Sequence, residues 1–303
     1  MNPTGTRRSF LAGAGALAVT AGLPSFAAAA GRLKELRYAY AAMPWGNEER
    51  KAIEDIAAAG YPGVQFRANA VTDFKPSELK QSLAEHRLTF VALSSGTISI
   101  DRPAAAQMDT HSANALFAKE AGGQYLQILD ELKGHPRSAT PDECRRLGKM
   151  LTELGRRTAD IGIPLGYHNH LNTLSEMPDN LDRILENSDP KYVHLELDTA
   201  HLAAGGGDPA KFILKYHERL LFMHLKDLRS IPVDTPGAKY PFEFVELGRG
   251  QVDFASVFAA LEKINFRGWA VVELDREPDK TRTPKESAEF SRNFLEQKMG
   301  VAV

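Results

Sequence analysis

The sequence predicts an α/β fold, a single (β/α)₈ TIM barrel preceded by an N-terminal signal segment. Eight short apolar segments alternate with eight segments in which apolar residues recur every three or four positions. About 270 residues remain after the N-terminal segment, which is close to the usual size of such a barrel. Polar residues that suit a metal ion stand at the ends of four of the strand-like segments.

The expected strands are short runs rich in Val, Leu, Ile, Phe and Tyr. In chain order they cover 35–40, 63–67, 88–94, 124–129, 163–168, 193–198, 220–225 and 269–274. Each of them is followed by a helix-like pattern, which is the order that builds a parallel sheet closed by helices.

The expected helices are marked by their periodicity and by the residues at their ends. They cover 47–59, 76–86, 104–121, 141–161, 178–187, 208–216, 253–264 and 283–297. Gly60, Gly122 and Gly162 end helices where a positive φ is often needed. Pro141 and Pro178 stand in first turns beside acidic residues. The longest irregular stretch, 228–250, follows the seventh strand, and we expect it to form a lid or a substrate wall.

Residues 1–30 have the pattern of a twin-arginine export signal. Arg7 and Arg8 precede a run from Ala12 to Ala30 without charge, and small residues over 25–30 offer a cleavage site. The alternative is a membrane anchor, since the run is nearly long enough to cross a bilayer. Its weak hydrophobicity favours cleavage, which would leave no stable membrane span. We therefore expect recognition by the twin-arginine export machinery, a periplasmic or otherwise exported location, and one barrel domain over 31–303.

Composition excludes some partners. Lys and Arg total 37 against 39 Asp and Glu, and the net charge of −2 gives no reason to expect nucleic acid or an anionic membrane as a partner. The single cysteine, Cys144, allows no internal disulfide, and a structural role is expected for it. The sequence leaves an oligomer possible.

Four strand ends carry the candidate metal ligands His168, Asp198, His224 and Glu273. In a parallel barrel the C-terminal strand ends meet at one mouth, so these side chains are expected to be neighbours. Taken singly, each is also explained as a hydrogen-bonded core residue. Together, a His, Asp, His and Glu suit a divalent cation.

Candidates for proton transfer and substrate binding lie beside these ligands. His168 and His170 share one strand face, so one is expected to bind metal and the other to handle protons or substrate. Lys226 shares the face of His224, where it would hold an oxyanion or, with a depressed pKa, act as a base. His201 would bind a sugar hydroxyl or would be an ordinary loop histidine. Either His194 or Glu196, in phase with Asp198, would orient a ligand from deeper in the barrel.

Aromatic residues near the first strand offer a flat apolar wall for a sugar ring. Tyr40 and Trp45 are the substrate-binding candidates there, and ordinary core packing is the alternative explanation.

Five stretches together resemble the xylose isomerase-like TIM-barrel group, also called the sugar phosphate isomerase/epimerase superfamily. The stretches are Tyr167-His168-Asn169-His170, 195–198 with His201, 223–227, 247–254 and 271–275. The resemblance covers nearly all of 31–303. It implies one Mn²⁺, Co²⁺, Mg²⁺ or Zn²⁺ on His168, Asp198, His224 and Glu273, with His170, Lys226 and Glu273 as catalytic candidates. Arg249, in the fourth stretch, joins the substrate-binding candidates.

The fifth strand departs from one branch of this group. Epimerases that resemble tagatose 3-epimerase use a glutamate where this chain has His168, so only Glu273 of their glutamate pair is present. Similar dehydratases combine the metal with histidine or lysine bases. We therefore expect a metal-dependent isomerase or epimerase acting on a sugar or keto-sugar through an enolate. The alternatives are a lyase or dehydratase of a keto-cyclitol or 3-keto-glycoside and, in another class, a non-catalytic sugar-binding barrel.

Overall fold

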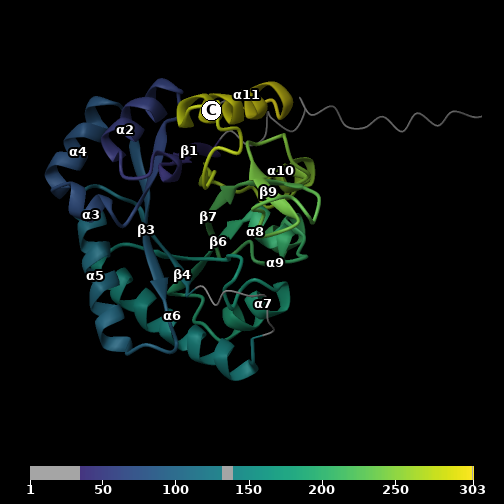
Figure 1. Ribbon diagram of the computed structural model, residues 1–303. Helices are drawn as coiled ribbons and strands as arrows, with labels where there is room; N and C mark the ends of the chain where they lie inside the picture. Colours follow the sequence, from purple (N-terminus) through teal and green to yellow (C-terminus); the bar gives the residue numbers. More distant parts are fainter. Residues whose placement is uncertain (1–34, 132–138, 302) are drawn as a thin grey trace, which may run out of the picture.

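The chain folds into a closed barrel of eight parallel strands, seen nearly end-on in Figure 1. The computed structural model describes residues 35–131, 139–301 and 303. The expected export signal lies outside these described residues. Around the barrel the strands follow the order β1 (Arg37–Ala41), β10 (Trp269–Val272), β7 (Leu220–Leu225), β6 (Val193–Asp198), β5 (Leu165–His168), β4 (Tyr125–Asp130), β3 (Thr89–Ile98) and β2 (Gly63–Arg67). The predicted fold class is therefore confirmed.

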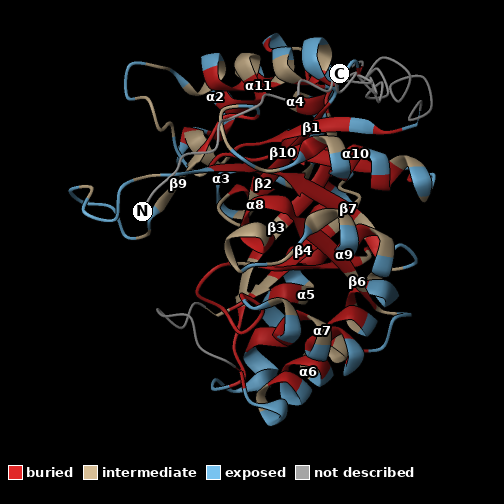
Figure 2. Ribbon diagram, turned by 90° about the vertical axis from the view of Figure 1, so that its right-hand side faces the viewer, coloured by how far each residue is buried: buried red, intermediate tan, exposed pale blue. Residues whose placement is uncertain are grey.

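Helices surround the strands and turn their exposed faces outward, as the burial colours of Figure 2 show. They are η1 (Met43–Trp45), α2 (Glu49–Ala58), α3 (Ala70–Asp73), α4 (Pro76–Glu85), α5 (Ala104–Glu120), α6 (Pro141–Ile161), α7 (Pro178–Glu186), α8 (Thr199–Ala204), α9 (Pro209–Lys215), α10 (Phe254–Lys263) and α11 (Pro284–Lys298). Helix α6 begins with a capping box between Thr140 and Glu143 and ends at Gly162, whose φ of 94° is the left-handed conformation expected there. The eight expected helices agree with this set within two residues at each end. None of the described helices is long and apolar enough to cross a membrane.

Strand alternation decides which side chains enter the barrel. On β1, Ala39 and Ala41 pack with Phe222, Val271 and Trp269 in an interior cluster, and Cβ directions alternate along a strand. The tyrosines between these alanines therefore face the surrounding helices. By the same alternation, His224 is in phase with Phe222 on β7 and Glu273 is in phase with Val271 on β10. Both side chains therefore point inward at the mouth.

The stretch 228–250, which the sequence predicts to be irregular, contains a hairpin. Strand β8 (Asp227–Ser230) pairs antiparallel with β9 (Phe242–Val245). The Asp227 carboxylate accepts hydrogen bonds from the backbone N–H groups of Leu228, Gly248, Gly250 and Val252 at 2.9 to 3.1 Å. This carboxylate fixes the return of the chain to α10, and the hairpin becomes an ordered wall over the β6 and β7 side of the barrel.

Candidate metal centre

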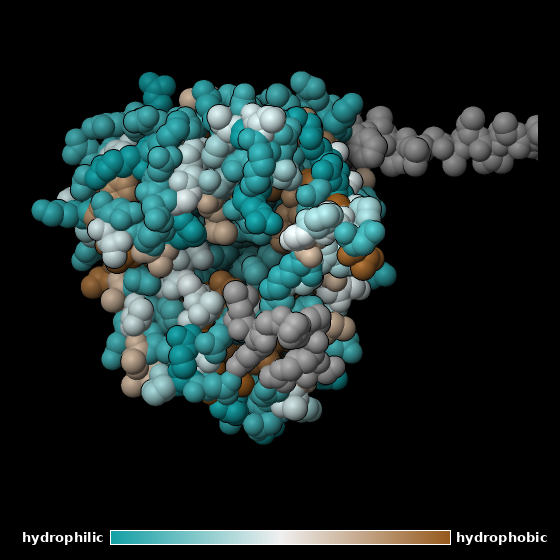
Figure 3. Space-filling view, viewed as in Figure 1, coloured by the Kyte–Doolittle hydropathy of each residue, from teal (hydrophilic) through white to brown (hydrophobic). Residues whose placement is uncertain are grey.

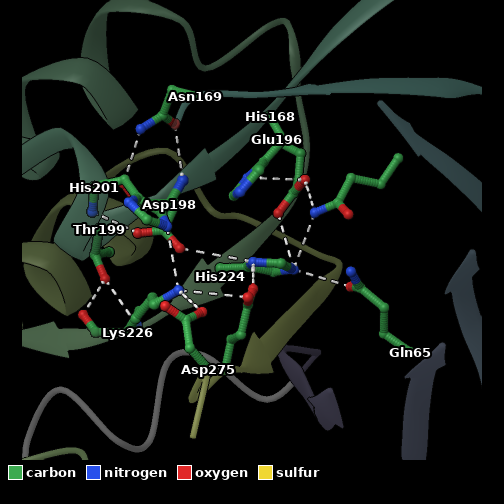
Figure 4. Close-up of polar contacts among 12 residues, drawn as sticks. Gln65, His168, Asn169, Glu196, Asp198, Thr199, His201, His224, Lys226 and Asp275 are labelled. Carbon is green, nitrogen blue, oxygen red and sulfur yellow. Dashed lines mark hydrogen bonds and ion pairs between the residues drawn. The ribbon is translucent and has the colours of Figure 1, made fainter. Parts of the chain in front are cut away.

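Three predicted ligands from neighbouring strands meet at the barrel mouth. His168 ends β5, Asp198 ends β6, and His224 lies on β7 opposite Asp198 in the strand register. One ligand atom from each lies within 4.8 Å of the others, and all three side chains are buried. Figure 4 shows the three side chains turned toward one another.

Glu273 completes the set from the segment that follows β10. Its Oε2 contacts Nδ1 of His224, and Oδ2 of Asp198 lies 3.7 Å from the same nitrogen. Within the described part of the chain, these three atoms are buried and make no hydrogen bond. Buried polar atoms are normally satisfied, so a cluster of unsatisfied donor atoms from one imidazole and two carboxylates fits a divalent cation.

Glu196 orients both imidazoles from deeper in the barrel. Its Oε1 lies 3.0 Å from Nε2 of His224, and its Oε2 lies 3.2 Å from Nδ1 of His168. Gln65 accepts from the same Nε2 at 2.9 Å, and Gln127 donates to Glu196 at 2.6 Å. The acceptor oxygen of Gln65 requires a proton on Nε2 of His224, the nearby Glu196 carboxylate favours that proton, and Nδ1 is left as the ligand atom. Burial alone would raise the pKa of Glu196. The two imidazoles have a larger opposite effect and lower the pKa to about 2, so Glu196 is ionised.

Asp198 is held so that only one of its oxygens is available. Its Oδ1 accepts from the backbone N–H of His201 at 2.7 Å and thereby caps α8. The side chain of Asn169 bonds both backbone groups of Asp198, at 2.9 and 3.2 Å. The remaining oxygen, Oδ2, therefore points to the ligand cluster with a fixed backbone behind it.

His168 also belongs to a second cluster, in which it joins His170 and His201 within 4.8 Å. The rings of His170 and His201 lie 3.8 Å apart, and Nδ1 of His170 donates to the carbonyl of Leu171 at 2.7 Å. Burial, with help from His168 and Lys226, lowers the pKa of His170 to about 4. His170 is therefore neutral near pH 7, and in the part of the chain that the structure describes its Nε2 has no hydrogen bond, so it can accept a proton.

The mouth of the barrel holds a small cavity between these groups. It measures about 60 Å³ and is lined by His168, His170, Glu273, Arg67 and residues of β2 to β4. Figure 3 shows the surface hollowed at the centre of this face, with hydrophilic side chains around the hollow. His170 and Glu273 thus face one space from opposite sides of the barrel.

Lys226 is a buried cation rather than a base. Its Nζ lies 2.6 Å from Asp275, 3.4 Å from Glu273 and 3.2 Å from Nε2 of His201 (Figure 4). Burial lowers the pKa of Lys226, but Asp275, Glu273 and Asp198 together raise it above its ordinary value. The expectation of a depressed pKa is therefore wrong, and the ammonium group donates to the carboxylates of Asp275 and Glu273.

His201 is buried, so the alternative of a surface loop histidine is wrong. Its Nδ1 accepts from the backbone N–H of Leu171 at 3.4 Å, and its Nε2 faces Lys226. Both ring nitrogens are thus engaged, and His201 supports His170 and Lys226 instead of offering a nitrogen to a sugar hydroxyl.

The structure does not bring the other three substrate-binding candidates to the mouth. Tyr40 lies on the outer face of β1, where its ring packs against Trp45 and Tyr61. Trp45 donates its indole N–H to Asp55 of α2. The expected sugar wall at Tyr40 and Trp45 is therefore corrected to outer core packing, because the alanines of β1 take the inward positions. Arg249 is corrected as well. Its guanidinium lies over the ring of Phe290 on α11 and 3.8 Å from Glu246.

Sequence reasoning missed Gln65 and Gln127. Each is a buried polar residue flanked by apolar ones on a strand, Gln65 on β2 and Gln127 on β4. A polar group in an apolar strand is costly to bury without a partner, and this holds for Gln65 and Gln127 as it does for His224. That signal was present in the sequence.

Comparisons with known proteins agree with this fold. A family model described as the xylose isomerase-like TIM barrel matches residues 53–297. Inosose dehydratase of Lacticaseibacillus casei is 27% identical over 274 residues, which cover 83% of this chain and 90% of that protein. Inosose dehydratase of Clostridium beijerinckii is 26% identical over 275 residues, covering 84% and 91%.

Solved structures share the fold at low sequence identity. The IOLI protein with a binding zinc atom has a TM-score of 0.72 at 17% identity and covers 87% of this chain and 98% of its own. The probable 3-DHS dehydratase AsbF from Bacillus anthracis has a TM-score of 0.71 at 15% identity, covering 86% and 99%. L-ribulose 3-epimerase has a TM-score of 0.70 at 16% identity, covering 88% and 95%. On the extent of the family match, this chain belongs to the xylose isomerase-like TIM barrel family.

Proposed function

We propose that the protein is a divalent-metal-dependent lyase that enolises a keto-sugar or keto-cyclitol and expels water or an alcohol from the adjacent carbon. One observation carries the choice of lyase over epimerase. The position that faces Glu273 across the ligand cluster holds His168, and the group beside it is the neutral imidazole of His170. A pair of carboxylates that exchanges a proton across the substrate is therefore not available. The relatives named inosose dehydratase, which match most of both chains, support the same choice.

The ligands for the ion are His168, Asp198, His224 and Glu273. Their donor set of two imidazoles and two carboxylates suits Zn²⁺, Mn²⁺, Co²⁺ and Mg²⁺ to different degrees, and Zn²⁺ and Co²⁺ accept such nitrogen ligands readily. A divalent ion held there supplies Lewis-acid polarisation of a carbonyl oxygen. Zinc is the ion that the similarly folded IOLI protein binds.

The remaining groups handle the proton. His170 lines the mouth cavity, and among the described residues no hydrogen bond reaches its Nε2, so it is placed to accept the C–H proton next to the carbonyl. Its orientation is fixed by the Leu171 carbonyl and by the ring of His201. Lys226 in turn holds His201 and neutralises Glu273 and Asp275. In this account Lys226 is a positioning residue.

We also propose that the enzyme works outside the cytoplasm. Arg7 and Arg8, followed by an uncharged run of small residues, support export in the folded state. Phosphorylated metabolites are mainly cytoplasmic, so a neutral sugar, cyclitol or oxidised glycoside is the expected substrate.

The test is a substrate panel with the metal-loaded protein in deuterated water. Inosose and 3-dehydroshikimate report elimination through the absorbance of the conjugated product, and L-ribulose and D-allulose report epimerisation. We expect elimination from at least one ketone and no epimer. Epimer formation with deuterium at carbon and no loss of water would favour the epimerase instead. Tight sugar binding without any exchange at carbon across the panel would indicate a non-catalytic barrel.

A further inference from the structure

A row of aromatic side chains runs along the hairpin to the metal centre. Tyr240 and Phe242 are stacked at 5.2 Å with their rings 12° apart, and Phe242 and Phe244 lie 5.8 Å apart. Phe244 contacts the His201 ring at 4.9 Å and lies under Nζ of Lys226 at 4.4 Å. Figure 1 places β9, which carries Phe242 and Phe244, beside α8. The aromatic row therefore ends at the groups that position His170.

A second cavity lies along this row. It measures about 490 Å³, within the range of about 300–1,000 Å³ that is usual for small-molecule sites. Its lining includes Tyr240, Phe242, Phe244, Asp275 and Arg276. Asp275 is the carboxylate that pairs with Lys226, and it is still about one third exposed. Asp275 and Phe244 thus line the hairpin cavity and also contact Lys226 and His201 beside the metal centre.

The lining of the hairpin cavity fits a sugar ring. Aromatic faces pack against the C–H face of a pyranose, and charged side chains at the edge accept or donate hydrogen bonds to its hydroxyl groups. The aromatic rings here are only partly buried, and the charged side chains of Lys239, Glu243, Asp275 and Arg276 surround them. Asp275 and Glu243 already pair with Lys226 and Arg229, and a wholly hydrocarbon occupant would offer no hydrogen bond to any of these charged side chains.

We propose that the hairpin cavity binds a second sugar ring, which is the leaving group of the reaction. The substrate would then be a disaccharide-type glycoside oxidised to a ketone in the ring that lies at the metal centre. This inference rests on the lyase function proposed above and names its substrate class. It assigns to the hairpin the sugar-binding wall that Tyr40 and Trp45 do not provide.

The reaction balances without a further reactant. Removal of the C–H proton next to the ketone gives the enolate, and its electron pair forms the C=C bond as the glycosidic C–O bond breaks. The departing sugar oxygen takes up one proton, so a keto-glycoside gives an enone and a free sugar. A preceding oxidation of one ring hydroxyl to a ketone must supply this substrate.

Binding is tested with glycosides that cannot react because they lack the ketone. Calorimetric titration of the metal-loaded protein would use cellobiose, maltose and lactose as disaccharides. Methyl glucoside lacks a second ring, and phenyl glucoside has an aromatic one. We expect at least one disaccharide to bind with a Kd about tenfold lower than that of methyl glucoside. Equal Kd values for methyl glucoside and all three disaccharides would overturn the inference. So would a preference for phenyl glucoside with no disaccharide preference, since that assigns the cavity to an aromatic group.

Variants locate the binding. Phe242→Ala, with Phe242→Leu as a more conservative change that keeps apolar volume, should abolish the tenfold preference for the disaccharide. Tyr240→Phe keeps the ring and removes only the hydroxyl bond to Asn172, so most of the preference should remain. Val233→Ala is the matched hairpin control, because Val233 is 87% exposed and does not line the cavity. An unchanged preference in both Phe242 variants would place the second ring elsewhere and contradict the proposal.

The two proposals fail separately. If the protein eliminates water from inosose but shows no disaccharide preference, the lyase function stands and the hairpin assignment falls. If disaccharides bind through Phe242 but no ketone of the panel undergoes elimination, the sugar site stands, and both the lyase function and the leaving-group role that rests on it fall.

Discussion

Nε2 of His224 lies 3.0 Å from the carboxylate of Glu196, a residue that is fully buried and touches no predicted substrate position. This pair fixes which nitrogen of His224 faces the ion. Glu196→Gln keeps the side-chain shape but removes the charge and turns an amide N–H toward one imidazole. We expect it to weaken metal binding by about 10- to 100-fold, the usual effect of losing such a partner. Competition with a chromophoric chelator measures this, and unaltered affinity would show that Glu196 serves packing alone.

Asp198→Asn should remove most of the bound ion while the barrel stays folded. The remaining amide oxygen still caps α8, because Oδ1 already makes that hydrogen bond. Asp208→Asn is a matched control, since Asp208 caps α9 through the same kind of bond to Lys211 at 3.1 Å. Metal analysis should give one ion per chain for Asp208→Asn only. The free energy of unfolding should change by about 1 kcal/mol or less in both variants. Stoichiometric metal in Asp198→Asn would mean that a different set of residues holds the ion.

Substitution of the two histidines at the end of β5 should have different effects on metal occupancy and on turnover. His168 belongs to both histidine-containing clusters, whereas His170 belongs to one and lines the cavity beside His201. We expect His168→Ala to lower metal occupancy. His170→Ala should keep the metal and lose about 10²–10⁴-fold in turnover, the contribution of a positioned acid or base. Loss of metal in His170→Ala with retention in His168→Ala would exchange their roles.

Most of the barrel could be predicted because strand and helix periodicity are local properties of the sequence. The convergence of His168, Asp198 and His224 followed from the same reasoning, since they lie at or next to the ends of successive strands whose ends must meet. Tyr40 shows where prediction from the sequence fails. Both faces of a barrel strand are buried, so an aromatic residue on β1 has no sequence signal for inside or outside, and only Ala39 and Ala41 fix the phase.

The hairpin and the ionisation of Lys226 depend on distant residues. Strand β9 pairs with β8 across a long turn with several prolines, and its register is held by Asp227. The pKa of Lys226 depends on Asp275, which belongs to the segment after β10. Neither relationship has a fixed spacing in the sequence, so the sequence predicts neither the hairpin nor which of two roles Lys226 takes.

Replacing Arg7 and Arg8 by Lys tests the proposed export. The transport machinery reads the arginine pair, so the double Lys variant should stay in the cytoplasm with its signal uncleaved. Cell fractionation and the mass of the recovered protein measure this. Replacement of Arg156 and Arg157 by Lys on α6 is the control, because it changes the same residue types in the barrel domain. Recovery of the Arg7 and Arg8 variant outside the cytoplasm at the normal level would contradict the assignment.

The most direct test of the metal-dependent lyase is deuterium exchange at the carbon next to the ketone of inosose, followed by NMR with matched samples of metal-loaded and metal-stripped protein. Enolisation at the centre of His168, Asp198, His224 and Glu273 predicts deuterium incorporation or elimination in the loaded sample. Restoring one equivalent of ion should recover the activity in the stripped sample. Equal rates in the two samples, or no exchange by protein that holds one ion per chain, would contradict the account.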